Sequence, residues 1–312
     1  MNLPNSVEVV EVGMRDGLQM ESVFIDTETK ADLINSLMNA GVLHLEATSF
    51  VSPRAVPQLA DASELLSKLQ RRPGSTISVL APNIKGVERA IAAAADEVVV
   101  FVSSTESHNQ KNLNRSIARS LDDIAAISDY LEDKNIAKKG AIACAFGCPF
   151  EGELPPQAIN NIAAHYYRLG FRALTLGDTT GMATPRLVTQ TVSELRAAFP
   201  DMKLSLHFHN TRGLGLVNVM AGLYAGVDSF ESSIGGLGGC PFAPGASGNI
   251  STEDLVYLLD EMGIHTGIKL EPLIEVAQRM ESILGRSLAG QVMKAGPRLT
   301  LHKLQDTMSA IG

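Results

Sequence analysis

The amino-acid sequence predicts an α/β fold, a (β/α)8 barrel with an additional C-terminal helix. Eight short segments rich in β-branched residues alternate with longer helical segments along the 312-residue chain. No long linker interrupts the alternation, and barrels of this kind use about 250 residues as one domain. We therefore expect one domain over 1–312, with the barrel at about 7–265 and a helical extension at about 268–312. A doubly wound open sheet is the alternative, because strand counts from a single sequence are imprecise.

The predicted strands are short and bounded by turn or helix-start residues; they span 7–13, 43–49, 77–82, 97–104, 140–146, 173–178, 204–209 and 229–236. The segments between them carry helix punctuation. Asp26 or Thr27 can cap the start of a helix that Gly41 ends. The segment 155–170 has proline near its first turn and glycine after its last, and 86–95 is rich in alanine. Each strand is thus followed by a helical pattern.

Composition limits the classes of function. The chain is 45% hydrophobic and 19% charged, which is typical of a folded globular protein. Its net charge of -8 disfavours a general nucleic-acid or anionic-membrane partner. Neither a secretory signal nor an uncharged apolar run of about 20 residues is evident. Three cysteines, an odd number, fit a reducing compartment, and we expect a cytoplasmic protein.

Two histidines lie two residues apart in LHFHNTRG (206–213). Side chains alternate along a β-strand, so His207 and His209 face the same side at the strand's catalytic end. A pair of hydrogen-bonded core histidines is the alternative, but two on one face favour metal ligation. A divalent ion also needs oxygen ligands, which Asp16 and Asn249 can supply. These four residues are the predicted metal ligands.

Further polar residues collect at strand ends. Arg15 and Gln19 follow the first strand, Glu46 lies in the second, and Asp178 ends the sixth. The simplest alternative for Asp178 is a turn or helix cap, and Arg15 with Glu46 can form a purely structural buried pair.

The cysteines differ in their surroundings. Cys240 lies in the glycine-rich segment GGLGGC, a setting that favours a reactive or proton-transferring thiol over an inert buried one. Cys144 is expected within the fifth strand and in the core, whereas the role of Cys148 is left open.

Several segments together resemble the 3-hydroxy-3-methylglutaryl-CoA lyase family, within the metal-dependent DRE-type TIM-barrel lyases. The resemblance covers about residues 7–285 and rests on VEVGMRDGLQ, EATSFVSPRAVPQLAD, CAFGCPFEG, LGDTTG, HFHNTRG, GGLGGCPFAPGASGN and TEDLVYLLDEMGIHTG. RDG and HxH mark only the wider superfamily, which includes isopropylmalate and homocitrate synthases. SFVSP and the cysteine-bearing glycine loop are more specific to the lyases.

The resemblance implies a role for each matching residue. Metal ligation falls to the four residues already predicted, with Mg²⁺ or Mn²⁺ as the ion and Co²⁺ as a further candidate. Arg15 matches the catalytic arginine, Cys240 the catalytic cysteine, and Glu46 and Asp178 supporting acidic residues. Arg15 and Gln19 would contact the substrate, and Lys85 or Lys111 the phosphates of CoA.

The implied activity is retro-Claisen cleavage of 3-hydroxy-3-methylglutaryl-CoA to acetyl-CoA and acetoacetate. Three positions depart from the family pattern, which usually has Pro at Met14, Asn at Met20 and Asp at Asn210. Met20 and Asn210 lie close to predicted site residues, so a lyase for a related ester such as citramalyl-CoA, which would yield acetyl-CoA and pyruvate, is the alternative. An acyl-CoA condensing synthase and a non-catalytic binder of metal or acyl-CoA are two further alternatives. We expect a homodimer, with the C-terminal helix as a possible interface.

Overall fold

The computed structural model, which describes residues 3–239 and 248–301, contains a closed parallel barrel of eight strands. Each strand pairs with the next along the chain, and β8 pairs with β1 to close the barrel. The strands are β1 (Glu8–Glu11), β2 (His44–Ser49), β3 (Thr76–Leu80), β4 (Glu97–Ser103), β5 (Ala137–Ala143), β6 (Ala173–Asp178), β7 (Lys203–Phe208) and β8 (Ser229–Ser232). The predicted (β/α)8 fold is confirmed, and the open sheet is excluded.

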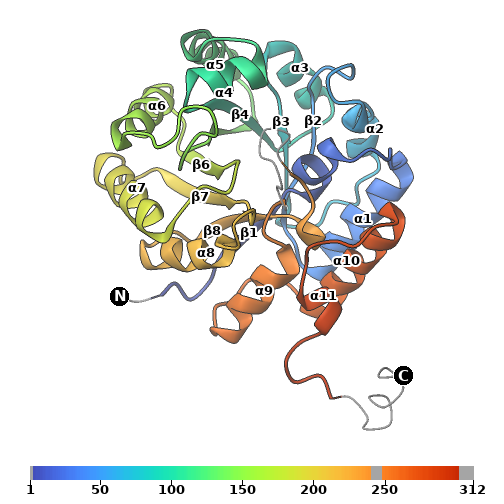
Figure 1. Cartoon of the computed structure of the whole chain (residues 1–312). Coiled ribbons are helices and arrows are strands. Elements are labelled where there is room, and N and C mark those ends of the chain that lie inside the picture. The colour runs from blue at the N-terminus through green and yellow to red at the C-terminus, as the bar shows by residue number, and fades with distance from the viewer. Residues whose placement is uncertain (1–2, 240–247, 302–312) are drawn as a thin grey trace.

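Helices surround the barrel as an outer ring (Figure 1). They are α1 (Thr27–Ala40), α2 (Ala62–Ser67), α3 (Ile84–Ala92), α4 (Glu106–Leu113), α5 (Ile117–Leu131), α6 (Pro156–Arg168), α7 (Pro185–Ala198), α8 (Gly215–Tyr224), α9 (Thr252–Glu261), α10 (Leu270–Leu284) and α11 (Val292–Ala295). Short turns of other helix types are η1 (Gly13–Gly17), η2 (Leu18–Met20), η3 (Pro57–Leu59) and η4 (Ile234–Gly236). The main core lies between the strands and the inward faces of these helices.

Helix ends follow the chemistry expected from the sequence. Asp26 caps α1 by accepting a hydrogen bond from the backbone N–H of Thr29. Gly41 ends this helix with a φ of 105°, a conformation that disfavours residues with a side chain. The extra C-terminal helix is α10, which packs against α1 and α9. No helix in the described part of the chain is long and apolar enough to cross a membrane.

The fifth strand differs from its predicted range of 140–146. It begins at Ala137 and ends at Ala143, so Cys144 lies just beyond the strand, buried and with a φ of 56°. The prediction that Cys144 lies within this strand was wrong, although its burial is confirmed. The predicted strand began too late because Lys138 and Lys139 suggested a solvent-exposed turn before residue 140. Lys139 instead faces the barrel interior and is buried.

The end of β8 is fastened by two buried carboxylates. Glu11 accepts hydrogen bonds from the backbone N–H of Ile234 at 2.9 Å and from the Thr252 hydroxyl at 2.6 Å. Glu253 accepts one from the backbone N–H of Gly235 at 3.0 Å through Oε2, while its Oε1 has no hydrogen-bond partner among the described residues. Burial raises the pKa of Glu11 to about 7 and that of Glu253 to about 8.

The raised pKa of Glu253 predicts a pH-dependent stability. Because this pKa is about 8 in the folded state against an ordinary value of 4.5, the folded state retains a proton that the unfolded state releases. This contribution to the free energy of unfolding is complete at low pH and is lost as the pH rises toward 8. Its size is on the order of a few kcal/mol. Glu253→Gln removes the titrating group. We expect the melting temperature of the variant to fall less between about pH 5 and pH 8 than that of the wild type; parallel curves would contradict this.

Candidate active site

The first turn after β1 places two charged side chains at the mouth of the barrel. In the π-helical turn η1, a Cβ at Gly13 would lie 2.5 Å from the Glu11 carboxylate, and one at Gly17 would lie 2.8 Å from Leu237. Only glycine permits such close approach. The two glycines of GMRDG thus allow the turn to pack tightly. Arg15 and Asp16, which lie between these glycines in the sequence, reach the cavity.

Arg15 is held by two carboxylates. Its Nε donates to Glu46 Oε1, and its guanidinium donates to Asp16 Oδ1 at 2.6 Å. Burial disfavours the charged form of Arg15, but attraction by Glu46 and Asp16 raises its pKa above the ordinary value. The Arg15–Glu46 pair, which the sequence offered as a structural alternative, is present in the fold. Arg15 supplies a permanent positive charge beside the cavity.

Two segments bring three possible metal ligands together. His207 and His209 lie at the end of β7, and Asp16 lies in η1 after β1. The Nε2 atoms of the two imidazoles lie 3.1 Å apart, and His209 Nε2 lies 3.8 Å from Asp16 Oδ2. One potential ligand atom from each of the three residues lies within 4.8 Å of the others. The prediction that the histidines share one face is therefore confirmed, and the group is arranged as a candidate metal site.

Asn249 completes this group. Its Nδ2 donates to Asp16 Oδ2 at 2.7 Å and to the Leu237 carbonyl at 2.9 Å. Its Oδ1 is buried and has no hydrogen-bond partner among the described residues. A buried oxygen without a donor is costly unless a ligand satisfies it. The two imidazole nitrogens, one carboxylate and one amide oxygen fit a divalent cation.

Protonation in this cluster favours ligation. Burial opposes ionisation of Asp16, but Arg15 and the two histidines lower its pKa to about 2. Burial, followed by repulsion from His207, lowers the pKa of His209 to about 4. Asp16 is therefore ionised and His209 neutral at neutral pH, the forms that bind a metal. Although burial acts to lower it, the pKa of His207 is raised because Nδ1 bonds to Glu231.

Glu231 and Lys139 are buried polar residues that the sequence analysis did not identify. Glu231 accepts from His207 Nδ1 at 3.1 Å and from Lys139 Nζ at 2.9 Å. Glu231 could have been found from strand alternation, because it lies opposite His207 in the β7–β8 register. Lys139 could not, because the predicted strand began at residue 140, whereas β5 begins at Ala137.

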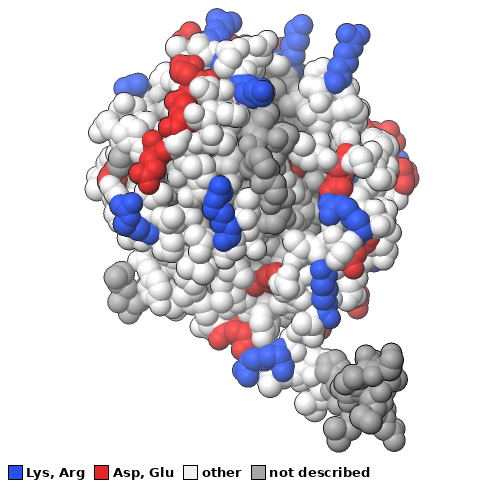
Figure 2. Space-filling view, in the orientation of Figure 1, with Lys and Arg blue, Asp and Glu red and all other residues white. Residues whose placement is uncertain are grey.

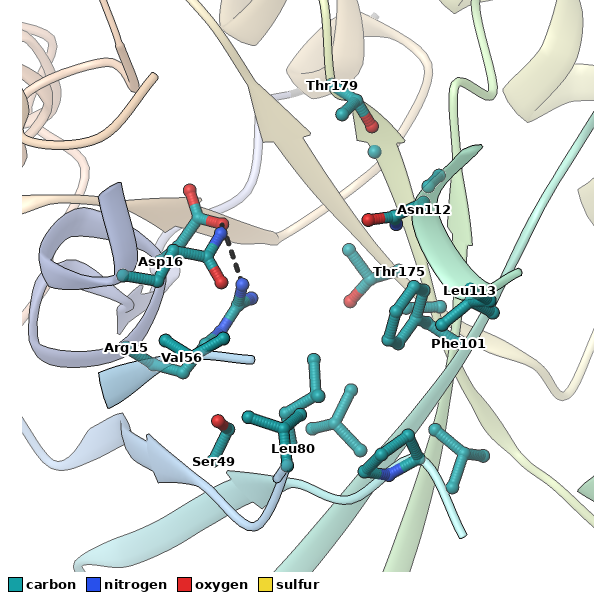
Figure 3. A pocket seen from close by; sticks show the side chains of 18 of the residues that line it. Arg15, Asp16, Ser49, Val56, Leu80, Phe101, Asn112, Leu113, Thr175 and Thr179 are labelled. Carbon is teal, nitrogen blue, oxygen red and sulfur yellow. Dashed lines mark hydrogen bonds and ion pairs between the residues drawn. The ribbon is translucent and has the colours of Figure 1, made fainter. Parts of the chain in front are cut away.

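The cluster opens into a cavity of about 650 Å³. In the close-up, Arg15 and Asp16 form one wall and Phe101, Asn112 and Leu113 the opposite one (Figure 3). Gln19 also lines the cavity, and its amide donates to Asp16 Oδ1 at 3.0 Å. The combined polar and apolar walls suit a ligand that has both a charged or oxygen-rich end and an extended apolar part.

The two departures from the family pattern near this region have different positions. Met20 lines the cavity and is 47% exposed. Asn210 instead accepts from the backbone N–H of Gly215 at 3.1 Å and supports the start of α8. Only Met20 therefore lies where it can contact a ligand in the cavity.

Three further predicted site residues that the structure describes, Asp178, Lys85 and Lys111, lie outside the central cluster. The Asp178 carboxylate accepts from the backbone N–H groups of Met182 and Ala183, as a turn-stabilising residue does, and burial raises its pKa to about 7. Lys85 and Lys111 are exposed and lie close in sequence to Asn83 and Asn112, which line the cavity. Cys240 lies outside the described residues.

The face seen in Figure 1 carries interspersed charges. Lys and Arg side chains alternate with Asp and Glu over its described part, without one continuous basic surface (Figure 2). Recognition of an anionic group on this face would therefore depend on a few local basic side chains.

Comparison with known proteins identifies the family of the chain. A sequence model described as HMGL-like matches residues 6–280. The chain is 43% identical over 297 residues to the mitochondrial hydroxymethylglutaryl-CoA lyase of Macaca fascicularis, covering 95% of this chain and 91% of that protein. It is 39% identical to the 3-hydroxy-3-isohexenylglutaryl-CoA/hydroxymethylglutaryl-CoA lyase of Pseudomonas aeruginosa, covering 95% and 98% of the two chains.

A solved structure gives the same result. An HMG-CoA lyase from Acinetobacter baumannii, determined in complex with coenzyme A and 3-methylmalate, superposes with a TM-score of 0.93. It is 42% identical in sequence, and the match covers 97% of this chain and 99% of that one. The protein therefore belongs to the HMGL-like family.

Proposed function

We propose that this protein cleaves 3-hydroxy-3-methylglutaryl-CoA to acetyl-CoA and acetoacetate. The observation that carries the proposal is the convergence of Asp16, His207 and His209 beside the Arg15 guanidinium in one cavity. Relatives about 40% identical over most of the chain bear the name of this lyase, and a similar structure contains coenzyme A.

Asp16, His207, His209 and Asn249 Oδ1 would hold the divalent ion, Mg²⁺ or Mn²⁺, with Co²⁺ as a third candidate. Such an ion supplies Lewis acidity, which lowers the pKa of a hydroxyl that it binds. The protein places an ionised carboxylate and a neutral imidazole side by side as ligands. The lowered pKa values of Asp16 and His209 keep both in that state at neutral pH.

Arg15 acts on the charge that develops during bond cleavage. Transfer of the C3 hydroxyl proton to a nearby base, for which His207 and Asp16 are the candidates, converts the C3–O bond to a carbonyl. The electron pair of the C2–C3 bond moves to C2. The product at C2 is the enolate of acetyl-CoA, whose negative charge extends onto the thioester oxygen. The Arg15 guanidinium, already oriented by Glu46 and Asp16, stabilises that charge without further rearrangement.

A proton must then reach C2 of the enolate to complete acetyl-CoA. We assign this proton donation to the Cys240 thiol, following the resemblance to the lyases. Gln19 would contact the substrate beside Asp16, and Lys85 or Lys111 the CoA phosphates near the cavity's outer end. Asp178 would act as a supporting residue through the turn that it stabilises.

Citramalyl-CoA is a second candidate substrate, because Met20 replaces the family's usual asparagine at a position that lines the cavity. The single domain, the homodimer and the cytoplasmic location stay predictions.

The proposed reaction is tested by identifying its products. Purified protein with Mg²⁺ or Mn²⁺ is given 3-hydroxy-3-methylglutaryl-CoA and, separately, each citramalyl-CoA enantiomer. We expect acetoacetate from the first, with a strongly reduced rate for Cys240→Ala. Pyruvate from citramalyl-CoA alone would change the substrate but keep the chemistry, whereas no turnover of any ester would contradict the lyase proposal.

Arg15→Gln tests the role of the guanidinium. Removing a preorganised positive group that stabilises transition-state charge lowers kcat by about 100- to 1000-fold. The control is Arg286→Gln, which removes an exposed arginine paired with Glu21. We expect the control to retain its wild-type rate. A loss below about tenfold in Arg15→Gln would show that Arg15 has little part in the chemical step.

Metal affinity is expected to increase with pH. The pKa of His207 lies above 6.5, so at lower pH a proton occupies the ring nitrogen that faces the cluster. Displacing one proton makes binding about tenfold tighter per pH unit below the pKa of His207. Calorimetric titration of Mn²⁺ into metal-free protein should thus show tighter binding at about pH 8 than at about pH 6. An affinity that does not change with pH would exclude a protonated histidine as the competing group.

A further inference from the structure

A buried carboxylate and a buried lysine lie directly behind the candidate metal site. We propose that Glu231, fixed by Lys139 and Thr175, is a positioning residue that sets the tautomer and orientation of His207. The inference rests on the proposed function only in taking His207 as a metal ligand. It adds a second layer of residues to which neither the sequence nor the resemblance assigned a role.

Three donors converge on the Glu231 carboxylate from three neighbouring strands. Oε2 lies 3.1 Å from His207 Nδ1 on β7. Oε1 accepts from Lys139 Nζ on β5 at 2.9 Å and from the Thr175 hydroxyl on β6 at 2.6 Å. Both oxygens are thus engaged, and the carboxylate is held in one orientation inside the barrel.

This arrangement determines the proton on neutral His207. An ionised carboxylate can only accept hydrogen bonds, so it selects the tautomer with the proton on Nδ1. The lone pair then lies on Nε2, the atom that is 3.1 Å from His209 Nε2. A carboxylate behind a ligating histidine orients the ring and makes it a stronger ligand.

Lys139 keeps Glu231 ionised in a buried position. The side chains of both residues are only 5% exposed. Burial alone would favour a neutral carboxylic acid, which could donate to His207 and select the wrong tautomer. The lysine charge offsets this tendency at a cost in desolvation. A buried ion pair is a weak source of stability, so a role in orienting His207 accounts better for its position.

His209 lacks this support. Its Nδ1 is buried and has no hydrogen-bond partner among the described residues. Burial disfavours the charged form of His209. The two histidines therefore have different tasks: His207 is fixed from behind, whereas His209 is placed by the backbone of its turn, which pairs with Asn249.

The test uses four variants and a control at another buried lysine. Glu231→Gln removes the charge, Lys139→Met removes the counter-ion, and Lys139→Arg restores a positive charge. Lys30→Met is the control, because Lys30 is also buried and pairs with Asp61 at 2.9 Å on the outside of the barrel. Thr175→Val removes one hydrogen bond to Glu231 without changing charge, in case Lys139→Met fails to fold.

The first readout is the His207 tautomer in full-length, metal-free protein, from ¹⁵N-histidine NMR at mildly alkaline pH. We expect the Nδ1–H form in the wild type, Lys139→Arg and Lys30→Met. We expect a mixture or the Nε2–H form in Glu231→Gln and Lys139→Met, and a smaller change in Thr175→Val. An unchanged tautomer in folded Glu231→Gln would overturn the proposal.

The second readout is the affinity for Mn²⁺. Removing an outer-shell partner of a metal ligand weakens binding about 10- to 100-fold. We expect this loss in Glu231→Gln and Lys139→Met, recovery in Lys139→Arg, and none in Lys30→Met. Equal losses in Lys139→Met and Lys30→Met would indicate general destabilisation and contradict a positioning role. Neither readout requires substrate turnover, so failure of the lyase proposal would leave both results interpretable.

Discussion

The Asp16 carboxylate is the point at which separate segments of the chain meet. It accepts hydrogen bonds from Arg15 and Gln19 in the first turn and from Asn249 after β8, and it lies 3.8 Å from His209 after β7. These contacts join the beginning of the barrel to its end. Because the barrel is closed, the carboxyl ends of β1 and β7 lie across one opening, and a single carboxylate can serve both.

Charge balance at the barrel mouth follows from this geometry. Asp16, Glu46 and Glu231 are all buried, and a buried carboxylate without a partner is costly. Arg15 bonds to the first two and Lys139 to the third. Asn249, whose Nδ2 donates to Asp16, has a buried Oδ1 without a hydrogen-bond partner among the described residues. The polar interior is thus arranged around a position suited to a cation.

The fold could be predicted because its signals are local. Strand and helix patterns alternate eight times, and residues such as Asp26 and Gly41 mark helix ends by their own chemistry. The two histidines of the candidate metal site could also be predicted from the sequence, because a spacing of two places both on one face of a strand. The ends of the strands were harder to predict. The start of β5 was missed because it contains a pair of lysines, and no neighbouring residue in the sequence shows that Lys139 is neutralised by Glu231, 92 residues away.

Side-chain contacts with the following turn explain the other two differences. Asn210 adjoins His209 in sequence, but its side chain turns to the start of α8 instead of the cavity. Asp178 ends a strand as expected, yet bonds to its own turn. In the Asp178↔Phe208 and Gly177↔His207 register, Asp178 aligns with a residue on the opposite face from His207. The type of residue at a strand end is therefore not enough to predict a place in the site. Whether its side chain points into the barrel or away from it decides whether it reaches the site.

The proposed metal site joins four residues from three segments around one divalent ion. Anomalous X-ray diffraction from crystals grown with Mn²⁺ tests this arrangement directly. We expect one strong peak within bonding distance of Asp16, His207 Nε2, His209 Nε2 and Asn249 Oδ1, with His207 Nδ1 still bonded to Glu231. No peak at saturating Mn²⁺, or a peak away from the two histidines, would show that these residues do not form the site.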